Sequence, residues 1–462
     1  MSTPTQTIDA AVLVGVQLPD VSDDAHAADL AELRRLVTTL GYDVVATVSQ
    51  KRPALSRGAV LGEGKLRELA KHTGGTGVVP SGAPEKKDKA RLRREATGDE
   101  RDAAVEEDAV EDAEEASAAR RPSIVVVDHD LSPSQMRNLE RATGAQVLDR
   151  TGVIIDIFHR HAKSREAKIE VEIARLSYVA PRLRETGGGA DRQRGGIGGK
   201  GAGESAGELD RRKIRDRIAE LRTELAAIDR TAGVRRAQRQ DQRRVALVGY
   251  TNAGKSSLMR ALTGSEVLVA DKLFATLDTT VRALHPATTP RVLVSDTVGF
   301  IKKLPHDLVA SFRSTLDEAR EASLLLYVAD ASDPTFRGQL EVTRTVLAEI
   351  GASDVPSRLL LNKADRLDGT TRRALAQEFP DAVVLSAKSA EDVTALRHTI
   401  LAYFESTMID GELMVPYGKQ HLLAEVHEAA RVVSEEYDEN GGRLRVRAHP
   451  TALARLTSLL VR

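Results

Sequence analysis

The sequence predicts an α/β protein with a helical hairpin in its middle, and three patterns carry this prediction. Short apolar runs alternate with amphipathic stretches before residue 158 and again from 243 to 404, which is typical of strands alternating with helices. Between these regions, apolar residues recur every three or four positions, as in long paired helices. A short tail mixes both patterns. We therefore expect domains at 1–158, 159–242, 243–404 and 405–462.

Composition narrows the class of protein. The chain has 462 residues, which suits roughly three domains, and 41% of them are hydrophobic and 29% charged, as in soluble globular proteins. The absence of cysteine excludes a disulfide scaffold, a thiolate metal site and a cysteine nucleophile, and it fits a cytoplasmic location. No apolar run approaches the roughly 18 residues of a membrane-spanning helix, and the polar start lacks a secretory signal pattern.

The first domain is expected to hold a partly parallel sheet. Strands are predicted at 11–16, 44–48, 123–127 and 146–149, and helices at 25–40, 65–71 and 134–143. A basic block at 86–94 and an acidic run at 99–115 interrupt this pattern, with few large apolar residues between them. We expect residues 83–120 to be a disordered insertion or a solvated helix within the domain, because such a segment buries too little surface to fold.

The middle domain is expected to be a helical hairpin. Helical patterns cover 154–178 and 208–241, and the loop between them spans 187–207. In the second arm, Ile214, Ile218, Leu221, Leu225 and Ile228 alternate spacings of four and three, which is typical of a coiled-coil seam.

The third domain is expected to contain buried parallel strands at 245–248, 292–295, 324–329, 358–361 and 382–385. The tail is expected to form a small α+β domain, with strands at 413–416 and 444–448, a helix at 421–437 and a turn at 440–442.

A phosphate-binding loop follows the first of these strands. It fits G-x-x-x-x-G-K-[ST] and comprises Gly249, Tyr250, Thr251, Asn252, Ala253, Gly254, Lys255 and Ser256. Its two glycines allow backbone N–H groups to point at phosphate oxygens, and the helix expected at 257–263 adds the positive end of its dipole. Lys255 would reach the terminal phosphates, and Ser256 would be a ligand of Mg²⁺.

Three further motifs lie at the ends of later strands, where α/β sheets bind ligands. Asp296, Thr297, Val298 and Gly299 follow one strand; Asp296 would act in the second coordination shell of Mg²⁺, and Gly299 would donate its N–H to a γ-phosphate. Asn362, Lys363, Ala364 and Asp365 end another, and a buried Asp365 would accept hydrogen bonds that only guanine donates. Ser386, Ala387 and Lys388 end the last strand, where a backbone amide would meet the guanine carbonyl. This order resembles the translation-factor-like GTPases.

The segment Phe274, Ala275, Thr276, Leu277 and Asp278 is expected to be a nucleotide-dependent switch. On spacing alone, Thr276, Thr279 and Thr280 all compete as the threonine that completes the Mg²⁺ shell. Many GTPases have a glutamine directly after Asp-x-x-Gly, but this chain has Phe300, so intrinsic hydrolysis should be slow. Asn252 resembles an asparagine that recruits K⁺ in related GTPases, and a loop-stabilising role is the alternative.

A glycine-rich segment from Gly195 to Ser205 lies in the hairpin loop, between two groups of cations. These are Arg182, Arg184, Arg192, Arg194 and Lys200 on one side, and Arg211, Arg212, Lys213, Arg215 and Arg217 on the other. Either the segment is a flexible linker, or the tip enters an RNA groove, where cations meet phosphates. The RNA-binding candidates are Arg192, Arg194, Gly195, Gly196, Lys200, Arg211 and Arg212.

Nearly the whole chain resembles the HflX GTPases of the Obg–HflX group. The resemblance rests on Arg52-Pro53 with Gly62-x-Gly64-Lys65, Val147 to Gly152, Ile155 to Phe158, Glu170, Glu172 and Leu176, Gly195 to Glu204 with Glu208 and Asp210 to Arg212, Gly249 to Asn252, Leu273 to Asp278, and Asp296 to Ile301. The family usually has Pro at the position of Ala202 and Thr at that of Ser205.

The resemblance implies an α/β HflX N-terminal domain, a helical-hairpin linker, a P-loop GTPase domain with a parallel sheet and a small α+β C-terminal domain. It implies Lys255, Thr276 and Gly299 as catalytic residues, with Ser256 and Thr276 as Mg²⁺ ligands. It also implies a monomer that binds the large ribosomal subunit and its RNA, splits or rescues stalled ribosomes under stress, and is stimulated by the ribosome. The alternatives are a hibernation or assembly GTPase that binds without splitting, an RNA-remodelling nucleotidase, and a signalling GTPase with no ribosomal role.

Overall fold

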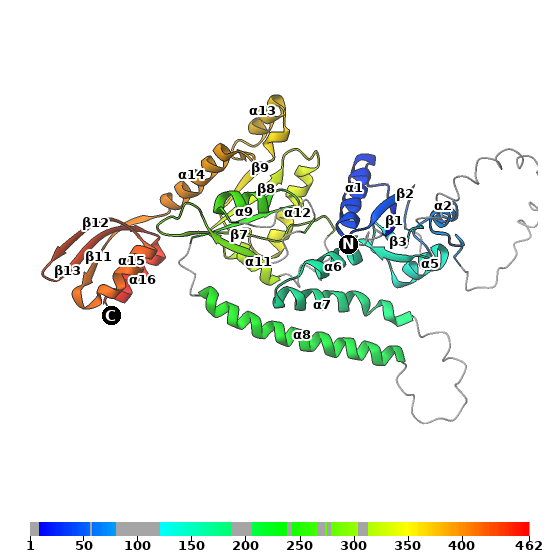
Figure 1. Cartoon of the computed structure of the whole chain (residues 1–462), viewed down its shortest axis with the longest axis horizontal. Coiled ribbons are helices and arrows are strands. Elements are labelled where there is room, and N and C mark those ends of the chain that lie inside the picture. The colour runs from blue at the N-terminus through cyan, green and yellow to red at the C-terminus, as the bar shows by residue number, and fades with distance from the viewer. Residues whose placement is uncertain are drawn as a thin grey trace, which may run out of the picture. The chain divides into compact units, whose positions relative to one another are not determined.

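The structure is a computed structural model that describes residues 9–55, 58–79, 121–185, 206–237, 243–265, 273–274, 279–303 and 313–461 (Figure 1). The predicted insertion at 83–120 lies wholly outside these residues, and the loop at 187–207 lies outside them up to residue 205. The chain divides into two compact units, one formed by Met1–Ile157 with Tyr178–Arg212 and the other by Phe158–Ser177 with Lys213–Arg462. Residues 178–212 of the hairpin therefore belong to the N-terminal unit.

The N-terminal unit is built on a parallel sheet with the strand order β2-β1-β3-β4. Its strands are β1 (Ala10–Gln17), β2 (Asp43–Lys51), β3 (Ile124–Val127) and β4 (Gln146–Asp149). Every residue of β1 and β3 is buried, which their unbroken apolar sequences predict for strands at the centre of a sheet. Because all four strands are parallel, their carboxyl ends lie at the same end of the sheet.

Helices α1 (Asp23–Thr39), α2 (Glu63–Thr73) and α5 (Pro133–Thr143) connect these strands and confirm the three predicted helices. Each begins one or two residues earlier than expected, and side-chain caps account for the earlier start of α1 and α5. The hydroxyl of Ser22 accepts from the amide of Ala25, and Ser132 forms a capping box with Gln135.

The two ends of the predicted insertion are fixed to the folded N-terminal unit. On one side, the N–H of Gly77 donates to the carbonyl of Ala142 at 2.9 Å. On the other, the N–H of Ser123 donates to the carbonyl of Ala10 at 3.1 Å, directly before β3. Backbone hydrogen bonds therefore attach the chain to the folded unit on both sides of the insertion.

The first arm of the predicted hairpin consists of two helices, where the sequence pattern indicated one. Helix α6 (Arg150–His161) and helix α7 (Arg165–Val179) are separated at 162–164, where the hydroxyl of Ser164 accepts from the amide of Ala167 and starts α7. A short 3₁₀ turn, η1 (Arg182–Glu185), follows α7. The break was missed because apolar residues continue in both helices on either side of it.

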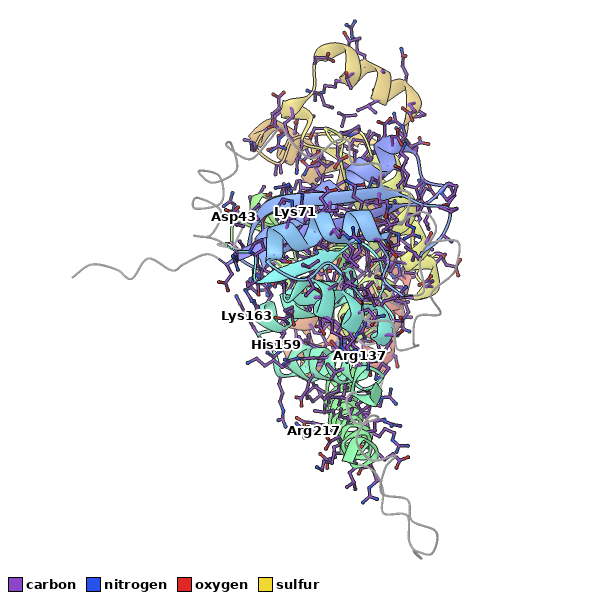
Figure 2. The ribbon with its side chains drawn as sticks, turned by 90° about the vertical axis from the view of Figure 1, so that its right-hand side faces the viewer. Asp43, Lys71, Arg137, His159, Lys163 and Arg217 are labelled. Carbon is purple, nitrogen blue, oxygen red and sulfur yellow. The ribbon has the colours of Figure 1, made fainter. Side chains whose placement is uncertain are left out.

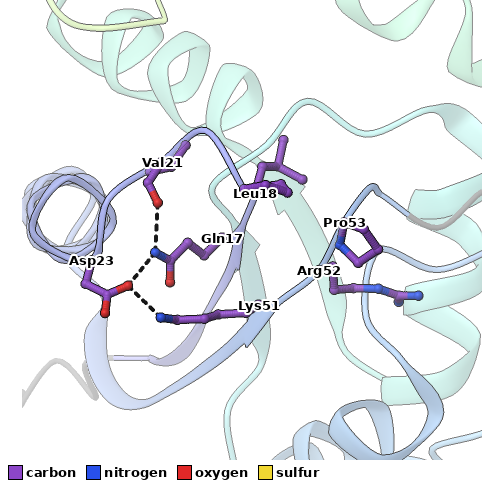
Figure 3. Close-up of a pocket in the computed structure, with 8 residues that line it drawn as sticks. Gln17, Leu18, Val21, Asp23, Lys51, Arg52 and Pro53 are labelled. Atoms are coloured by element: carbon purple, nitrogen blue, oxygen red, sulfur yellow. Dashed lines mark hydrogen bonds and ion pairs between the residues drawn. The ribbon is translucent and has the colours of Figure 1, made fainter.

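Helix α8 (Ala206–Ala237) packs against α7 through the predicted seam. Ile169, Ile173 and Leu221 are buried in this contact, and Leu176, Ile218, Leu225 and Ile228 pack around them; Ile214 is outside the cluster. Ion pairs between exposed side chains flank the seam, Arg165 with Glu224 at 2.7 Å and Arg217 with Glu172 at 3.2 Å (Arg217 is labelled in Figure 2). Such exposed pairs contribute little, so the apolar seam holds the two helices together.

The third domain contains a sheet with the order β10-β9-β8-β5-β7-β6. Its strands are β5 (Arg243–Gly249), β6 (Thr280–Ala283), β7 (Val292–Asp296), β8 (Leu324–Asp330), β9 (Ser357–Asn362) and β10 (Val383–Val384). Its helices are α9 (Lys255–Thr263), α11 (Arg313–Arg320), α12 (Phe336–Glu349), α13 (Gly369–Glu378) and α14 (Ala390–Ser406), with a 3₁₀ turn η3 (Ala364–Arg366). The five predicted strands are confirmed. Edge strand β6 was not predicted and is antiparallel to β7.

The C-terminal domain is an antiparallel sheet with the order β11-β13-β12. It comprises β11 (Ile409–Pro416), the 3₁₀ turn η4 (Tyr417–Leu422), α15 (Leu423–Ala429), β12 (Arg431–Asp438), β13 (Gly441–Ala448) and α16 (Pro450–Val461). The helix predicted at 421–437 is wrong in its second half, because α15 stops at Ala429 and the β-branched pair Val432 and Val433 continues as β12. Within the described part of the chain, no helix combines the length and apolar character needed to cross a membrane.

Candidate nucleotide-binding site

The phosphate-binding loop joins β5 to α9 and requires both of its glycines. Gly254 has a φ of +96°, and a Cβ atom there would lie 2.2 Å from Nδ2 of Asn362. A Cβ atom on Gly249 would lie 2.2 Å from the carbonyl oxygen of Val328. Helix α9 then starts at Lys255 with no side-chain cap, which leaves its first amide groups for an anion.

Lys255 is buried inside this loop, and its Nζ donates to the carbonyls of Gly249 at 3.0 Å and Tyr250 at 2.8 Å. Burial lowers the pKa of Lys255 to about 8, and the nearby carboxylate of Asp296 opposes this shift. A phosphate group would supply the negative charge that keeps the ammonium protonated.

The oxygen atoms expected to serve Mg²⁺ lie together at the start of α9. The hydroxyl of Ser256 donates to Oδ2 of Asp296 at 2.7 Å, and Asp296 is buried at the end of β7. A hydroxyl and a carboxylate beside a phosphate loop are hard oxygen donors of the kind that Mg²⁺ prefers. These two residues therefore fit the ion, whereas Thr276 lies outside the described residues.

The segment after Asp296 is attached directly to the phosphate loop. Phe300 N donates to Gly249 O at 3.1 Å, and Thr251 N donates to Phe300 O at 2.8 Å. The hydroxyl of Tyr250 accepts from the N–H of Lys302 at 2.7 Å, a contact that the sequence pattern did not reveal. These bonds hold Gly299 against the loop.

The side chain of Phe300 points into the core of the domain, where it packs with a cluster that includes Val248 and Leu316. It is therefore turned away from the phosphate loop. That residue 300 does not orient a water molecule stays a prediction, which rests on the absence of a polar atom in its side chain.

The base-recognition motifs are joined to the phosphate loop by Asn362. Its buried side chain donates from Nδ2 to the carbonyl of Ala253 at 2.9 Å and accepts at Oδ1 from the amide of Ala387 at 3.1 Å. One amide thus connects three predicted motifs. Lys363 forms an ion pair of 2.7 Å with Asp330 at the end of β8, a residue that the sequence analysis missed because it lies in a neighbouring strand.

Asp365 is exposed, contrary to the expectation of a buried carboxylate. It accepts from the hydroxyl of Ser386 at 2.7 Å and lies 3.3 Å from Nζ of Lys388. The hydrogen bond from Ser386 is the main cause that lowers the pKa of Asp365. The carboxylate is therefore charged and held in place at the outer end of the site.

Of the predicted switch, the structure describes Leu273 and Phe274 only; Ala275 to Asp278 lie outside it. Phe274 is buried and has a φ of +56°, which is unusual for an aromatic residue. Its ring meets that of Phe158 from α6 in a T-shaped contact with 4.6 Å between centroids. Packing of this kind offsets the cost of the backbone conformation.

Some of the other predicted site residues lie in the described part of the chain, and the rest lie outside it. Arg212 is exposed and Arg211 is half-buried on α8, whereas Arg192, Arg194, Gly195, Gly196 and Lys200 lie outside the described residues. Asn252 is exposed with a φ of +60°. In the described ranges, no group of His, Asp and Glu side chains has the arrangement of a metal site.

Known protein families match almost the full length of the chain. Residues 27–79 and 91–159 match a family described as "GTP-binding GTPase N-terminal", and residues 161–239 match one described as "GTP-binding GTPase Middle Region". Residues 244–363 match a family described as "50S ribosome-binding GTPase".

Individual relatives agree with these matches. GTPase HflX of Gluconacetobacter diazotrophicus is 65% identical over 449 residues, which is 97% of each chain. GTPase HflX of Escherichia coli is 35% identical over 435 residues, covering 93% of this chain and 91% of that one. A crystal structure of a GTP-binding protein from Sulfolobus solfataricus in complex with GDP aligns with 85% of this chain and 98% of its own, at 22% identity and a TM-score of 0.42. On the extent and identity of the sequence matches, the chain belongs to the HflX family of GTPases.

Proposed function

We propose that this GTPase binds the large ribosomal subunit in its GTP-bound form and separates stalled ribosomes into subunits. The observation that supports this most directly is the nucleotide site, in which Asn362 links the phosphate loop to the base-recognition motifs. The family description of residues 244–363 supports the choice of partner. Location in the cytoplasm and a monomeric state are part of the same proposal.

The nucleotide would be bound by the residues expected from the sequence. Lys255 would exchange its two carbonyl partners for β- and γ-phosphate oxygens, and Asp365 would accept from guanine. Ser256 and Thr276 would be ligands of Mg²⁺, with Asp296 acting through water; the ion neutralises phosphate charge when it is bound. A backbone amide among residues 386–388 would meet the guanine carbonyl.

Hydrolysis would turn the switch off. Thr276 and the N–H of Gly299 would contact the γ-phosphate, so both segments would be ordered together only with GTP. Because Phe300 is buried, a group outside this side chain would orient the water, and we propose that the ribosome supplies or positions it. Intrinsic hydrolysis would then be slow and ribosome-stimulated.

A K⁺ ion beside Asn252 could also contribute charge to this reaction. The left-handed backbone at Asn252 supports the alternative instead, since asparagine tolerates that conformation in tight loops. Hydrolysis measured in K⁺ and in Na⁺ separates the two: equal rates mean that Asn252 only stabilises the loop.

RNA contact would come from the hairpin tip. The candidates are Arg192, Arg194, Gly195, Gly196, Lys200, Arg211 and Arg212, and of these the structure places Arg211 and Arg212 in the first turns of α8. Cations on an accessible helix start can meet phosphates of an RNA groove.

The test is a sucrose-gradient profile of whole ribosomes with the protein and either a non-hydrolysable GTP analogue or GDP. Free subunits, with the protein on the large one and only in the analogue sample, are expected. Intact ribosomes that carry the protein would favour a hibernation role, and free ribosomes with no bound protein would reject the ribosome as partner. Lys255→Ala is expected to lose the analogue-dependent association.

A further inference from the structure

The buried carboxylate of Asp149, at the carboxyl end of β4, accepts four hydrogen bonds from three parts of the N-terminal unit. Asp149 accepts from the amides of Leu131 at 3.2 Å and Gly152 at 2.8 Å. It also accepts from the hydroxyl of Tyr178 at 2.7 Å and from Nη2 of Arg182 at 2.8 Å. The side chain of Asp149 is 0% exposed, so its charge depends on these partners.

Arg182 completes this arrangement with its second nitrogen. Nη1 donates to the carbonyl of Tyr178 at 2.6 Å, and the guanidinium lies 3.4 Å from the centre of the Tyr178 ring. Burial and the nearby Asp149 raise the pKa of Tyr178, so its hydroxyl remains protonated and donates. Asp149, Tyr178 and Arg182 thus bond to one another, and we call these three residues the Asp149 clamp.

The position next to the clamp is also sterically restricted. A Cβ atom on Gly152 would lie 2.7 Å from the hydroxyl of Tyr178, so glycine is required for this approach. Next to Asp149, the buried Arg150 pairs with Asp128 at 2.8 Å and with Glu32. Arg150 ties the start of α6 to other strands and helices of the unit, and Asp149 contacts the end of α7 and η1.

The position of the clamp in the chain gives it a role beyond packing. Tyr178 lies in the last turn of α7, and Arg182 begins η1, which ends at Glu185 directly before the predicted RNA-binding tip. Arg182 was expected among the cations that face RNA, but its side chain is only 19% exposed and is committed to Asp149. Residues 178–212 accordingly belong to the same compact unit as the β4 sheet.

We propose that the Asp149 clamp is a positioning device: it fixes the direction in which the chain leaves α7 toward the glycine-rich tip, and thereby sets the affinity of the tip for RNA. Its residues contact neither RNA nor nucleotide. This inference rests on the proposed function, since it assumes that the tip binds RNA of the large subunit.

Arginine variants separate positioning from direct phosphate contact. Arg182→Lys keeps the positive charge but loses the planar fork that reaches Asp149 and Tyr178 together, whereas Arg182→Gln loses both. Arg175→Gln is the matched control, because Arg175 is an exposed arginine on α7 and its substitution removes the same charge. Binding to isolated large subunits is measured with the non-hydrolysable GTP analogue. GDP affinity and basal hydrolysis show whether the GTPase domain of each variant is intact.

Both Arg182 variants are expected to weaken subunit binding by about tenfold, as expected for loss of a charge-assisted hydrogen bond, while Arg175→Gln stays within about twofold. Tyr178→Phe, which removes one hydroxyl and keeps the ring, should weaken binding by several-fold. If Arg182→Lys binds like the unsubstituted protein and Arg182→Gln does not, Arg182 contacts phosphate directly and the clamp is rejected. Wild-type binding by both Arg182 variants also rejects it.

A second readout does not depend on the ribosome. Amide hydrogen exchange of residues 186–205 is expected to become faster in Arg182→Lys and Tyr178→Phe and to stay unchanged in Arg175→Gln. Should the unsubstituted protein fail to bind the large subunit, the proposed function falls, and the exchange rates still decide whether the clamp holds the base of the tip. Unchanged exchange in both clamp variants would overturn it.

Discussion

The contact between Gly254 and Asn362 makes the phosphate loop depend on the absence of a single methyl group. Gly254→Ala would force an alanine to a φ of +96° and place its Cβ atom 2.2 Å from Nδ2 of Asn362. Asn362 would then have to give up its hydrogen bond to the carbonyl of Ala253. Since that bond joins the phosphate loop to the base-recognition motifs, the substitution should impair GDP binding.

Two costs add up in this variant. The left-handed backbone costs an alanine about 1–3 kcal/mol. Displacing the Asn362 amide costs roughly a further 1–3 kcal/mol, because a buried polar group loses its partner. The sum of about 2–6 kcal/mol corresponds to a loss of GDP affinity of at least about 30-fold.

The assay is a titration of the full chain with a fluorescent GDP, with a double-mutant cycle to isolate the steric part. In the Asn362→Ala background the clash is absent, so Gly254→Ala should lose less GDP-binding free energy there. The coupling free energy between the two substitutions should be about 1 kcal/mol or more. Gly264→Ala is the matched control: Gly264 has a φ of +65°, but its nearest neighbour, His285, is 3.6 Å away. GDP affinity within threefold of the unsubstituted protein in Gly254→Ala, or strictly additive losses, would refute the reasoning.

Three further predictions concern contacts of Tyr250, Phe158 and Ser256. Tyr250→Phe removes the acceptor for the Lys302 amide and should slow basal hydrolysis several-fold with little change in GDP affinity, as measured by phosphate release and fluorescent GDP titration. Phe158→Ala removes the ring that packs on Phe274; loss of a buried aromatic side chain should cost about 3–5 kcal/mol, and thermal unfolding followed by circular dichroism should show a lower midpoint. Chelation of divalent ions with EDTA should speed GDP release from the unsubstituted protein but not from Ser256→Ala, as measured by displacement of a fluorescent nucleotide.

Each of these has an outcome that would count against it. Equal hydrolysis rates in Tyr250→Phe would mean that the hydroxyl has no part in holding the Gly299 segment. An unchanged midpoint in Phe158→Ala would mean that the contact with Phe274 adds nothing to stability. Equal sensitivity to EDTA in Ser256→Ala would remove Ser256 from the proposed Mg²⁺ ligands.

The motifs of the nucleotide site were predictable because each is local in sequence. A phosphate loop is defined by consecutive residues between a strand and a helix, and β5 and α9 lie where the pattern placed them. The contacts that join the motifs were not predictable, because Asn362 meets Ala253 across 109 positions of the chain. The contact of Tyr250 with Lys302 and the ion pair of Asp330 with Lys363 were missed for the same reason.

The errors in secondary structure also have local physical causes. Strand β6 is short and half exposed, so its sequence carries no run of buried residues to mark it. In the C-terminal domain, the charged sequence after Ala430 resembles a helix surface, but pairing with β13 on one side decides the conformation of β12. Helix propensity is a weak preference that such tertiary pairing overrides.

The segment between α2 and β3 makes the N-terminal domain tolerant to changes in length. Its ends are held at Gly77 and Ser123 by bonds to Ala142 and Ala10, so the register of the sheet is set without it. The entropy of closing a loop grows only with the logarithm of its length, and doubling the length costs about 0.6 kcal/mol. This position is therefore suited to carry a grafted fluorescent protein or affinity tag, and relatives can differ in length here at little energetic cost.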